Sequence, residues 1–313
     1  MITVHMMGNI GNQMFIYAFA RSLQLEYNQD LTIDLSGLKR GYYSANYKLD
    51  CLNLPDDINY DLGKLSFWSR LKYRLTSKIY HIEYGVIQKM KSDLIVPLSV
   101  CRRWFRRGCF YNVNRQYYEY PHSNRKNLYA YGYFQSERYF DKYKDVISKD
   151  FRVKLPVSQR DKEFMDKMSK ENSVAVSIRA NKAPENPKVK DNLDLGFIDK
   201  DYYYRGMQEI AKRVDNPVFY IFADDLDIVK KEYEFPFPVT CVTPNDSATG
   251  IRLMYSCKHF VIANSTFSWW GAYLGEYPDK QIVMPEVFDR QGPARKDIFI
   301  GNPIKLSVKF LTE

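Results

Sequence analysis

The chain has 313 residues, of which 45% are hydrophobic, and it carries a formal net charge of +9. This length supports one large domain or two of moderate size, and the apolar content excludes a disordered chain. No apolar run reaches the roughly 20 residues of a membrane-spanning helix, and the first residues lack the basic region and long apolar segment of a signal peptide. We therefore expect a cytoplasmic protein.

The cysteines and histidines of this chain argue against disulfide bonds and metal sites. The five cysteines are odd in number and no two stand at C-x-x-C spacing, so we expect reduced thiols. The four histidines form no H-E-x-x-H or similar arrangement. We therefore expect neither a structural nor a catalytic zinc ion.

The first elements in the chain predict an α/β domain. Residues 2–7 form a short apolar strand, residues 8–13 form a loop rich in glycine and asparagine, and residues 14–24 carry apolar side chains at helical spacing. A second strand follows at 31–35. This β-loop-α-β order implies a parallel sheet.

Residues 62–110 differ in character from the segments on either side. Their pattern is helical, basic and aromatic, with eleven Lys and Arg but only two acidic residues, Glu83 and Asp93, between Lys64 and Arg107. We interpret the segment as an insertion into the first domain. Its charge requires an acidic partner, and the candidates are nucleic acid, an anionic membrane surface and a phosphorylated substrate.

Two interpretations of this basic segment remain open. Trp68, Tyr73, Trp104 and Phe105 interleave with Lys and Arg, which fits an interfacial helix on anionic lipid. Peripheral contact with the inner face of the cytoplasmic membrane is then reasonable. The alternative is a solvated, basic face of the first domain.

The rest of the chain continues the β/α order, and a linker divides it. The segment 151–157, marked by Pro156, separates two halves of the usual domain size, and we place the domains at 1–152 and 153–313. Strands are predicted at 128–134, 174–178, 217–223 and 258–264, and helices at 136–140, 159–168, 200–214 and 249–256.

The loops after the strands are the informative positions, because ligands of open α/β sheets bind beyond the carboxyl ends of the strands. The glycines of the first such loop let the backbone turn tightly and approach a ligand closely, but the loop matches neither G-x-G-x-x-G nor a P-loop. The alternative is a plain strand-to-helix turn in which asparagine side chains satisfy backbone groups. The candidate residues of this loop are Gly8, Asn9, Gly11, Asn12 and Gln13.

Arg179 ends the predicted strand at 174–178. The fork of donors on a guanidinium suits a diphosphate, and the end of a strand would aim it at a ligand. For an arbitrary arginine, a solvated charge at a strand end is the more common situation. The residues that surround it in the fold must therefore decide its role.

Two carboxylates, Asp224 and Asp225, follow the predicted strand at 217–223. Such carboxylates can hold a metal or accept hydrogen bonds from a base or a sugar. Residues 225–227 match the D-x-D metal pattern of some sugar-nucleotide transferases, but residues 199–201 match it too, so the pattern is a weak signal. The alternative is a capping turn before a helix.

The most site-like stretch follows the predicted strand at 258–264. It brings Asn264, Ser265, Thr266 and Ser268 to the start of an apolar helix, where free N–H groups and the helix dipole favour a phosphate. A plain N-cap would need only one hydroxyl. With the arginine, the carboxylates and the glycine loop, these residues describe a nucleotide-sugar site between two domains.

Four stretches form an ordered set of motifs along most of the chain: GNIGNQMF at 8–15, YGYFQ at 131–135, FADD at 222–225 and IANSTFSWWGAYL at 262–274. They resemble the bacterial α-1,2-fucosyltransferases of glycosyltransferase family 11. The resemblance implies a GT-B fold, in which two Rossmann-like β/α domains face a central cleft, the C-terminal domain binds GDP-L-fucose and the N-terminal half faces the acceptor. It also implies an inverting, metal-independent transfer of L-fucose to a glycan hydroxyl, O-2 of a galactoside, in surface polysaccharide or oligosaccharide synthesis. Acceptors for bacterial polysaccharide assembly often sit on lipid carriers, so a lipid-linked acceptor is reasonable.

The donor motif of related fucosyltransferases is altered in this chain. Their strand after the linker ends in H-x-R-R-x-D, whose first arginine grips the donor diphosphate. That position is kept as Arg179, whereas Ser177, Ala180 and Lys182 stand in place of the histidine, the second arginine and the aspartate. Losing one fork costs charge-assisted hydrogen bonds of roughly 1.5 to 3 kcal/mol each. We hypothesise that lysines restore the positive charge as point charges without bidentate geometry; the candidates are Lys182, Lys188 and Lys190.

The resemblance implies roles for the other candidate residues. Asp224 or Asp225 would recognise the guanine or the ribose. The amide and hydroxyls at the start of the last motif helix would hold the phosphates, and the glycine loop would face the acceptor. The phosphate candidates are Asn264, Ser265, Thr266 and Ser268, and the acceptor candidates are Gly8, Asn9, Gly11, Asn12 and Gln13.

The general base for the acceptor hydroxyl must lie within hydrogen-bond reach of it, and the sequence contains no such distance. His5, at a strand end close to the glycine loop, is a candidate, although a lone histidine beside a strand is more often structural. Asp199 and Asp201 are weaker candidates.

Three other functions remain open at this point: a family member that uses a different nucleotide sugar, an inactive sugar-binding relative, and a nucleic-acid-binding protein. The last explains the basic segment. It does not explain the hydroxyl-rich helix start or the carboxylates at 224 and 225, which would repel phosphates. We therefore expect no nucleic-acid partner.

Overall fold

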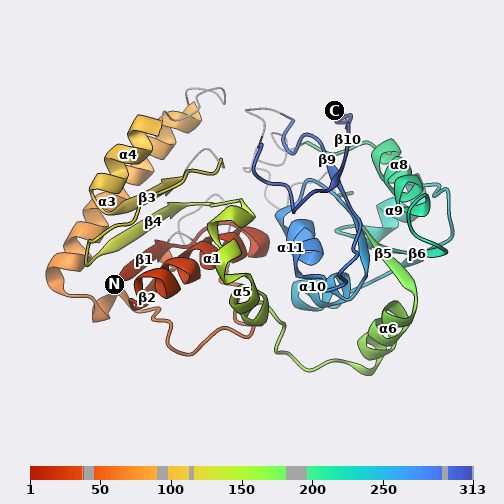
Figure 1. Ribbon diagram of the computed structural model, residues 1–313, viewed down its shortest axis with the longest axis horizontal. Helices are drawn as coiled ribbons and strands as arrows, with labels where there is room; N and C mark the ends of the chain where they lie inside the picture. Colours follow the sequence, from red (N-terminus) through yellow and green to blue (C-terminus); the bar gives the residue numbers. More distant parts are fainter. Residues whose placement is uncertain are drawn as a thin grey trace. The chain divides into compact units, whose positions relative to one another are not determined.

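The computed structural model describes residues 1–36, 38, 46–89, 98–112, 116–180, 196–290 and 295–311. The chain divides into two compact units (Figure 1). Unit 1 consists of Met1–Asp50, Leu54–Asp150 and Arg295–Ile298, and unit 2 of Cys51–Asn53, Phe151–Ala294 and Phe299–Glu313. The sequence placed the boundary after residue 152, whereas the chain enters unit 2 after Asp150, and two short segments belong to the unit opposite to the predicted one.

Unit 1 contains a four-stranded parallel sheet in the order β2-β1-β4-β3. Strand β1 lies between β2 and β4. The chain continues from β1 to β2 on one side of it and later returns to the other side, so the strand order reverses between β1 and β4. The strands are β1 (Ile2–His5), β2 (Leu31–Asp34), β3 (Cys109–Asn112) and β4 (Leu128–Gly132). Helix α1 (Ile10–Tyr27) connects β1 to β2. Three short helices follow β4: η2 (Glu137–Tyr139), η3 (Asp141–Tyr143) and α5 (Lys144–Asp150).

Residues 62–110 are an integral part of unit 1. They form η1 (Leu62–Lys64), α3 (Phe67–Lys89), α4 (Leu98–Arg106) and the start of β3. Tyr73 of α3 and Trp104 of α4 are only 1% and 2% exposed and pack with tyrosines of β3 and β4. These helices therefore supply part of the core of unit 1.

Unit 2 contains a six-stranded parallel sheet in the order β10-β9-β8-β5-β6-β7. From β5 the chain moves outward to β7 and then returns past β5 to β8, so the strand order reverses between β5 and β8. The strands are β5 (Asn172–Ile178), β6 (Pro217–Ala223), β7 (Val239–Cys241), β8 (His259–Ile262), β9 (Ile282–Pro285) and β10 (Ile304–Leu306). The two parallel sheets confirm the predicted α/β, GT-B-like fold class with two Rossmann-like domains.

The helices of unit 2 cover both faces of its sheet (Figure 1). They are α6 (Gln159–Lys170), α8 (Lys200–Ala211), α9 (Leu226–Glu232), α10 (Ser247–Tyr255) and α11 (Thr266–Leu274). Val176 and Ile178 of β5 pack in a cluster with Met207 of α8. Because successive side chains of a strand point to opposite faces, Ser177 between them points the other way and meets Ser268 of α11. No described helix of either unit is long and apolar enough to cross a membrane.

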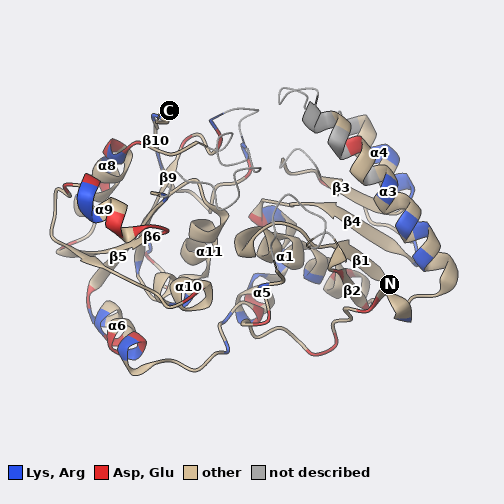
Figure 2. Ribbon diagram, turned by 180° about the vertical axis from the view of Figure 1, so that it is seen from behind, with Lys and Arg blue, Asp and Glu red and all other residues tan. Residues whose placement is uncertain are grey.

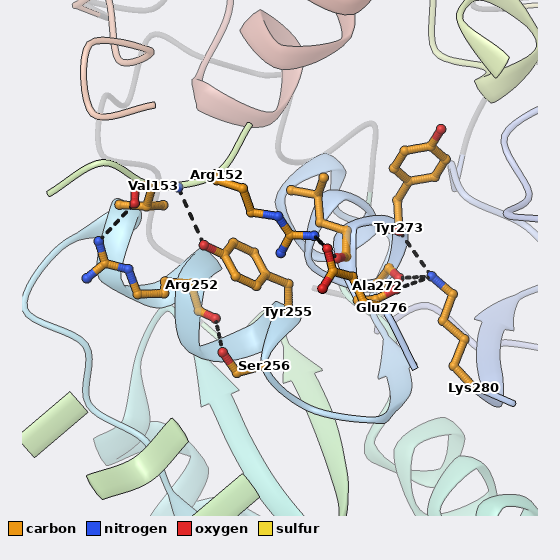
Figure 3. Close-up of polar contacts among 11 residues, drawn as sticks. Arg152, Val153, Arg252, Tyr255, Ser256, Ala272, Tyr273, Glu276 and Lys280 are labelled. Atoms are coloured by element: carbon orange, nitrogen blue, oxygen red, sulfur yellow. Dashed lines mark hydrogen bonds and ion pairs between the residues drawn. The ribbon is translucent and has the colours of Figure 1, made fainter. Parts of the chain in front are cut away.

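The segment predicted as a linker is fastened to unit 2 along its length (Figure 3). Arg252 of α10, only 3% exposed, donates to the carbonyls of Val153 and Pro156 at 3.2 Å each. The amide of Val153 donates to the Tyr255 hydroxyl at 3.4 Å, and the Arg152 guanidinium donates to the Leu274 carbonyl at 3.1 Å. The predicted linker is therefore bound to the surface of unit 2 by hydrogen bonds from the buried side chain of Arg252.

Candidate functional site

The carboxyl edge of the unit 2 sheet brings several of the predicted site residues together. Arg179 follows β5 and Asn264 follows β8, the two strands between which the strand order reverses. Both side chains donate to the carbonyl of Gly196, Arg179 Nη1 at 3.5 Å and Asn264 Nδ2 at 3.2 Å. Ligands of open α/β sheets bind at such a reversal point, so this edge is the candidate site of unit 2.

Arg179 is half-buried and lies over an aromatic ring. Its guanidinium carbon is 5.1 Å from the centroid of the Phe197 ring, an arrangement that holds the planar cation in place. Gly196 has φ +71°, and a Cβ there would lie 2.6 Å from the ring of Phe310. Neither Gly196 nor Phe197 was predicted as a site residue. A glycine just before an apolar pair was the available signal.

The two candidate carboxylates support loops of unit 2. Asp224 Oδ1 accepts from the backbone N–H of Ala180 at 2.7 Å, which ties the loop after β6 to the loop after β5. Asp225 caps α9 by accepting from the amides of Asp227 and Ile228 at 3.1 and 3.0 Å. The capping interpretation is therefore correct for Asp225.

The D-x-D pattern has a structural origin at both places where it occurs. Asp199 caps α8 and accepts from the Asp201 amide at 3.0 Å, just as Asp225 caps α9. No group of three or more His, Cys, Asp or Glu among the described residues could hold a metal ion. The acidic pairs thus begin helices, where a carboxylate satisfies free N–H groups.

The N-terminus of α11 leaves two hydroxyl side chains without a described partner. Ser265 is the N-cap residue but makes no capping hydrogen bond. Within the part of the chain that the structure describes, neither its hydroxyl nor that of Thr266 has a hydrogen-bond partner, and both residues are half-buried. The first amides of a helix have no partner within it, and the dipole is positive there. The arrangement therefore suits a phosphate.

The opposite end of α11 is closed by a lysine (Figure 3). Lys280 Nζ donates to the carbonyls of Ala272, Tyr273 and Gly275 at 2.8, 3.0 and 2.8 Å. A cation at the C-terminus of a helix satisfies the last carbonyls and complements the dipole. The C-terminal end of α11 is therefore satisfied within unit 2.

Ser268, a predicted phosphate ligand, has a different role in the structure. It is 1% exposed, and its hydroxyl oxygen lies 2.6 Å from that of Ser177, which is 6% exposed. This buried pair joins β5 to α11 at the position where related enzymes carry the histidine of their motif. The lysines proposed to replace the second arginine, Lys182, Lys188 and Lys190, lie outside the described residues.

The glycine loop of unit 1 is held by its own side chains. Gly8 has φ +76°, and Asn9 caps α1. Gln13 is fully buried and donates to the carbonyls of Gly8 and Asn46 at 2.8 and 3.0 Å. Gly11 lies buried in the first turn of α1. These contacts support the predicted strand-to-helix turn, and they fix the backbone beside the carboxyl end of β1.

A buried arginine connects to the same loop, and sequence reasoning missed it. Arg295, 6% exposed, donates to Gln135 Oε1 at 2.6 Å, and Gln135 Nε2 donates to Asn12 Oδ1 at 2.8 Å. The short segment 295–298, which belongs to unit 1, is thus connected to the glycine loop by two successive hydrogen bonds. Gln135 lies in one of the motif stretches, which was the available signal.

His5 lies at the end of β1 within a buried polar cluster. Its Nδ1 is 3.2 Å from Asp34 Oδ2, and the Tyr73 hydroxyl donates to the same oxygen at 2.6 Å. Burial alone would raise the pKa of Asp34, but the hydrogen bonds from His5, Tyr73 and the Ser36 amide lower it below its usual range. His5 is 1% exposed, which favours the structural interpretation of this histidine.

Comparison with known proteins gives the chain a family. A family model described as "Glycosyl transferase family 11" matches residues 1–304. The chain belongs to glycosyltransferase family 11. As a glycosyltransferase it acts on a nucleotide-sugar donor and a glycan acceptor.

Two relatives from Escherichia coli resemble this glycosyltransferase over most of both chains. An "Alpha-1,2-colitosyltransferase" is 27% identical over 281 residues, 88% of each chain. The "O-antigen biosynthesis glycosyltransferase WbnK" is 27% identical over 291 residues, 89% of this chain and 91% of the relative. Among solved structures, fucosyltransferase NodZ from Bradyrhizobium covers 86% of this chain and 92% of its own, with 13% identity and a TM-score of 0.45, a similarity too low to carry an argument.

Proposed function

We propose that this family 11 glycosyltransferase transfers L-fucose from GDP-L-fucose to a glycan hydroxyl, O-2 of a galactoside, in the synthesis of a surface polysaccharide or oligosaccharide. The observation that carries the proposal is the open N-terminus of α11 at the same sheet edge as Arg179. The motif resemblance to α-1,2-fucosyltransferases supports the choice of sugar.

The donor diphosphate would bind at the start of α11. The hydroxyls of Ser265 and Thr266 and the first helix amides would donate to its oxygens, with Arg179 as the charged fork. Asn264 would hold the backbone at Gly196, to which it donates a hydrogen bond. Asp224 would accept from the guanine or ribose while it accepts from Ala180 N, because a carboxylate has about four lone-pair sites.

The reaction would be an inverting displacement. The acceptor oxygen forms a bond to the anomeric carbon as the bond from that carbon to the diphosphate oxygen breaks. The electron pair of the broken bond passes to the diphosphate, and the proton of the acceptor hydroxyl passes to solvent water. Arg179 and the helix N-terminus would stabilise the negative charge that develops on this leaving group. We propose that no metal takes part. Activity that persists in EDTA would support this, whereas strict dependence on manganese would overturn it.

On the acceptor side, we propose that the glycine loop of unit 1, residues 8–13, contacts the acceptor. We assign His5 to the core and not to the acceptor, because it is 1% exposed and bonded to Asp34. An acceptor hydroxyl could not reach a ring so buried without movement of the surrounding helices. A wild-type pH profile of kcat in the variant His5→Gln would support this assignment.

A second donor is favoured by a specific observation. One relative is named as an α-1,2-colitosyltransferase, and colitose is L-fucose without the hydroxyl at C3. Both sugars would present the same anomeric carbon to the acceptor. We therefore propose GDP-colitose as the alternative donor.

Calorimetry with GDP followed by a donor panel tests the proposal. We expect GDP to bind and GDP-L-fucose to give the highest kcat/KM with a β-galactoside acceptor. A higher value for GDP-colitose would move the assignment to the second donor. Binding of GDP without turnover of any donor would indicate an inactive sugar-binding relative, and no binding of GDP would overturn the proposed function.

A further inference from the structure

An exposed apolar stripe runs along α3, the long helix of unit 1. Its six members, here called the outer stripe, are between 38% and 75% exposed. Isolated exposed apolar residues are common, but a contiguous row of large ones marks a contact surface. The outer stripe consists of Trp68, Leu71, Leu75, Ile79, Ile82 and Val86.

The spacing of these residues places them on one face of the helix. They follow one another at intervals of three or four residues, and at 3.6 residues per turn they fall within an arc of about 80°. Arg74 and Lys78 border this arc on one side and Lys72 borders it on the other, and all three are exposed. The result is an apolar face with a basic margin on both sides.

The core of unit 1 fixes the direction in which this face points. Tyr73, on the opposite face of α3, is 1% exposed and bonds to Asp34 at 2.6 Å. Trp104 of α4 donates to Glu83 of α3 at 2.8 Å. Tyr73 and Trp104 are therefore core residues, and neither fits the interfacial interpretation that the sequence left open for them. The outer stripe is held away from the core that these two residues form.

The charge around the outer stripe is almost entirely positive. Glu83 is the one acidic residue that the structure describes between Lys64 and Arg107, and it is paired with Arg103. Figure 2 shows Lys and Arg distributed along both α3 and α4. The exposed basic residues of α4 and its C-terminal turn are Arg102, Arg103, Arg106 and Arg107.

We propose that α3 docks unit 1 onto an anionic membrane surface, with the outer stripe among the lipid chains and the basic margin at the headgroups. This is the arrangement expected of an interfacial amphipathic helix, and Lys and Arg near an anionic leaflet are attracted to it. A second copy of the chain would bring like charges together. A nucleic acid would satisfy the charges but not the branched aliphatic side chains, which offer no surface for base stacking.

Flotation of the full chain with lipid vesicles tests the proposal. We expect the protein to float with vesicles that contain phosphatidylglycerol and much less with phosphatidylcholine alone. The pair Leu75→Glu and Ile79→Glu should abolish flotation, and the pair Arg74→Glu and Lys78→Glu should reduce it by about tenfold or more. The matched control for the apolar pair is Val157→Glu with Val287→Glu, exposed apolar residues of unit 2.

Trp68 provides a second measurement that reports the contact itself. It is 75% exposed, whereas the other three tryptophans of the chain are buried. Its fluorescence should therefore shift to the blue on addition of phosphatidylglycerol vesicles, and the variant Trp68→Phe should remove the shift. For the flotation assay, the matched control of the charge-reversal pair Arg74→Glu and Lys78→Glu is Lys162→Glu with Lys170→Glu on α6, both exposed.

Three outcomes would overturn the proposal: no flotation of the wild-type chain, equal flotation of the outer-stripe variants, or a dimer in sedimentation that the outer-stripe pair converts to monomer. The last would assign the stripe to a second copy. Vesicle binding requires no nucleotide sugar, so this proposal and the proposed function can fail independently.

Discussion

Replacement of Arg179 is the substitution with the largest expected effect on donor binding. Its guanidinium is positioned by the ring of Phe197 and by the carbonyl of Gly196, which Asn264 also binds. A hydrogen bond to a charged group contributes about 1.5–3 kcal/mol, and each 1.4 kcal/mol is tenfold in affinity. Arg179→Ala should therefore weaken GDP binding by about 10- to 150-fold.

The conservative variant separates charge from geometry. Arg179→Lys keeps the positive charge but loses the two-pronged fork, so its affinity for GDP should lie between those of the wild type and Arg179→Ala. Titration calorimetry at constant salt measures all three, with Arg213→Ala, an exposed arginine that pairs with Glu209, as the matched control. Equal affinity of all variants for GDP would refute the assignment of Arg179 to the diphosphate.

Three further results follow from the geometry of unit 2. Thr266→Val should weaken GDP binding by about two- to tenfold, because it removes a hydroxyl that would donate to a phosphate. Calorimetry measures this affinity, and thermal melts should show an unchanged melting temperature. Wild-type affinity for GDP would exclude a role for that hydroxyl. Ser177→Ala or Ser268→Ala should lower the free energy of unfolding by about 1–3 kcal/mol, because each leaves the other buried hydroxyl unpaired. The double variant should lose less than the sum of the two single losses. Single and double losses that add up in denaturant titrations would contradict the pairing. Burial, with a smaller contribution from the nearby Lys258, lowers the pKa of His259 in the folded chain. As the pH falls, the unfolded chain therefore takes up a proton at this histidine before the folded chain does, so the free energy of unfolding should be highest above about pH 6.5 and fall below it. Denaturant titrations across this range should show a weaker pH dependence for His259→Gln, and an unchanged dependence would show that another group is responsible.

The sequence could predict the parallel strands and the loops that follow them. The apolar runs that end at Arg179, Asp224 and Asn264 are short and bounded by polar residues, so both the strands and their ends are marked. The rule that ligands bind at the carboxyl edge then selects the loops that follow these strands, without knowledge of strand order. The reversal between β5 and β8, by contrast, depends on pairing between distant strands.

The orientation of α3 could not be predicted from its sequence. Large apolar residues occur on both faces of this helix, Tyr73 on one and Trp68 on the other, so its pattern does not reveal which face is buried. The decision is made by Asp34, which accepts from the Tyr73 hydroxyl and is distant in the sequence. Arg252 was missed for the same reason, since the carbonyls that it binds belong to a segment about a hundred residues earlier.

The roles of the hydroxyls at the start of α11 were only partly predictable. Ser265, Thr266 and Ser268 are equivalent as letters in a helix start. In the structure Ser268 turns into the core to meet Ser177, while the other two stay half-buried without a described partner. Which of three hydroxyls faces a ligand is set by the packing of α11 on β5, and that packing is not local.

The most direct test of the central claim is a transfer assay with GDP-L-fucose and a β-galactoside, in which the product linkage is read by NMR. We expect one GDP to be released for each fucose that becomes α-linked to O-2 of the galactose, and we expect Arg179→Ala to reduce the rate. Absence of transfer from any GDP-linked 6-deoxy-L-hexose, together with no measurable binding of GDP, would contradict the assignment.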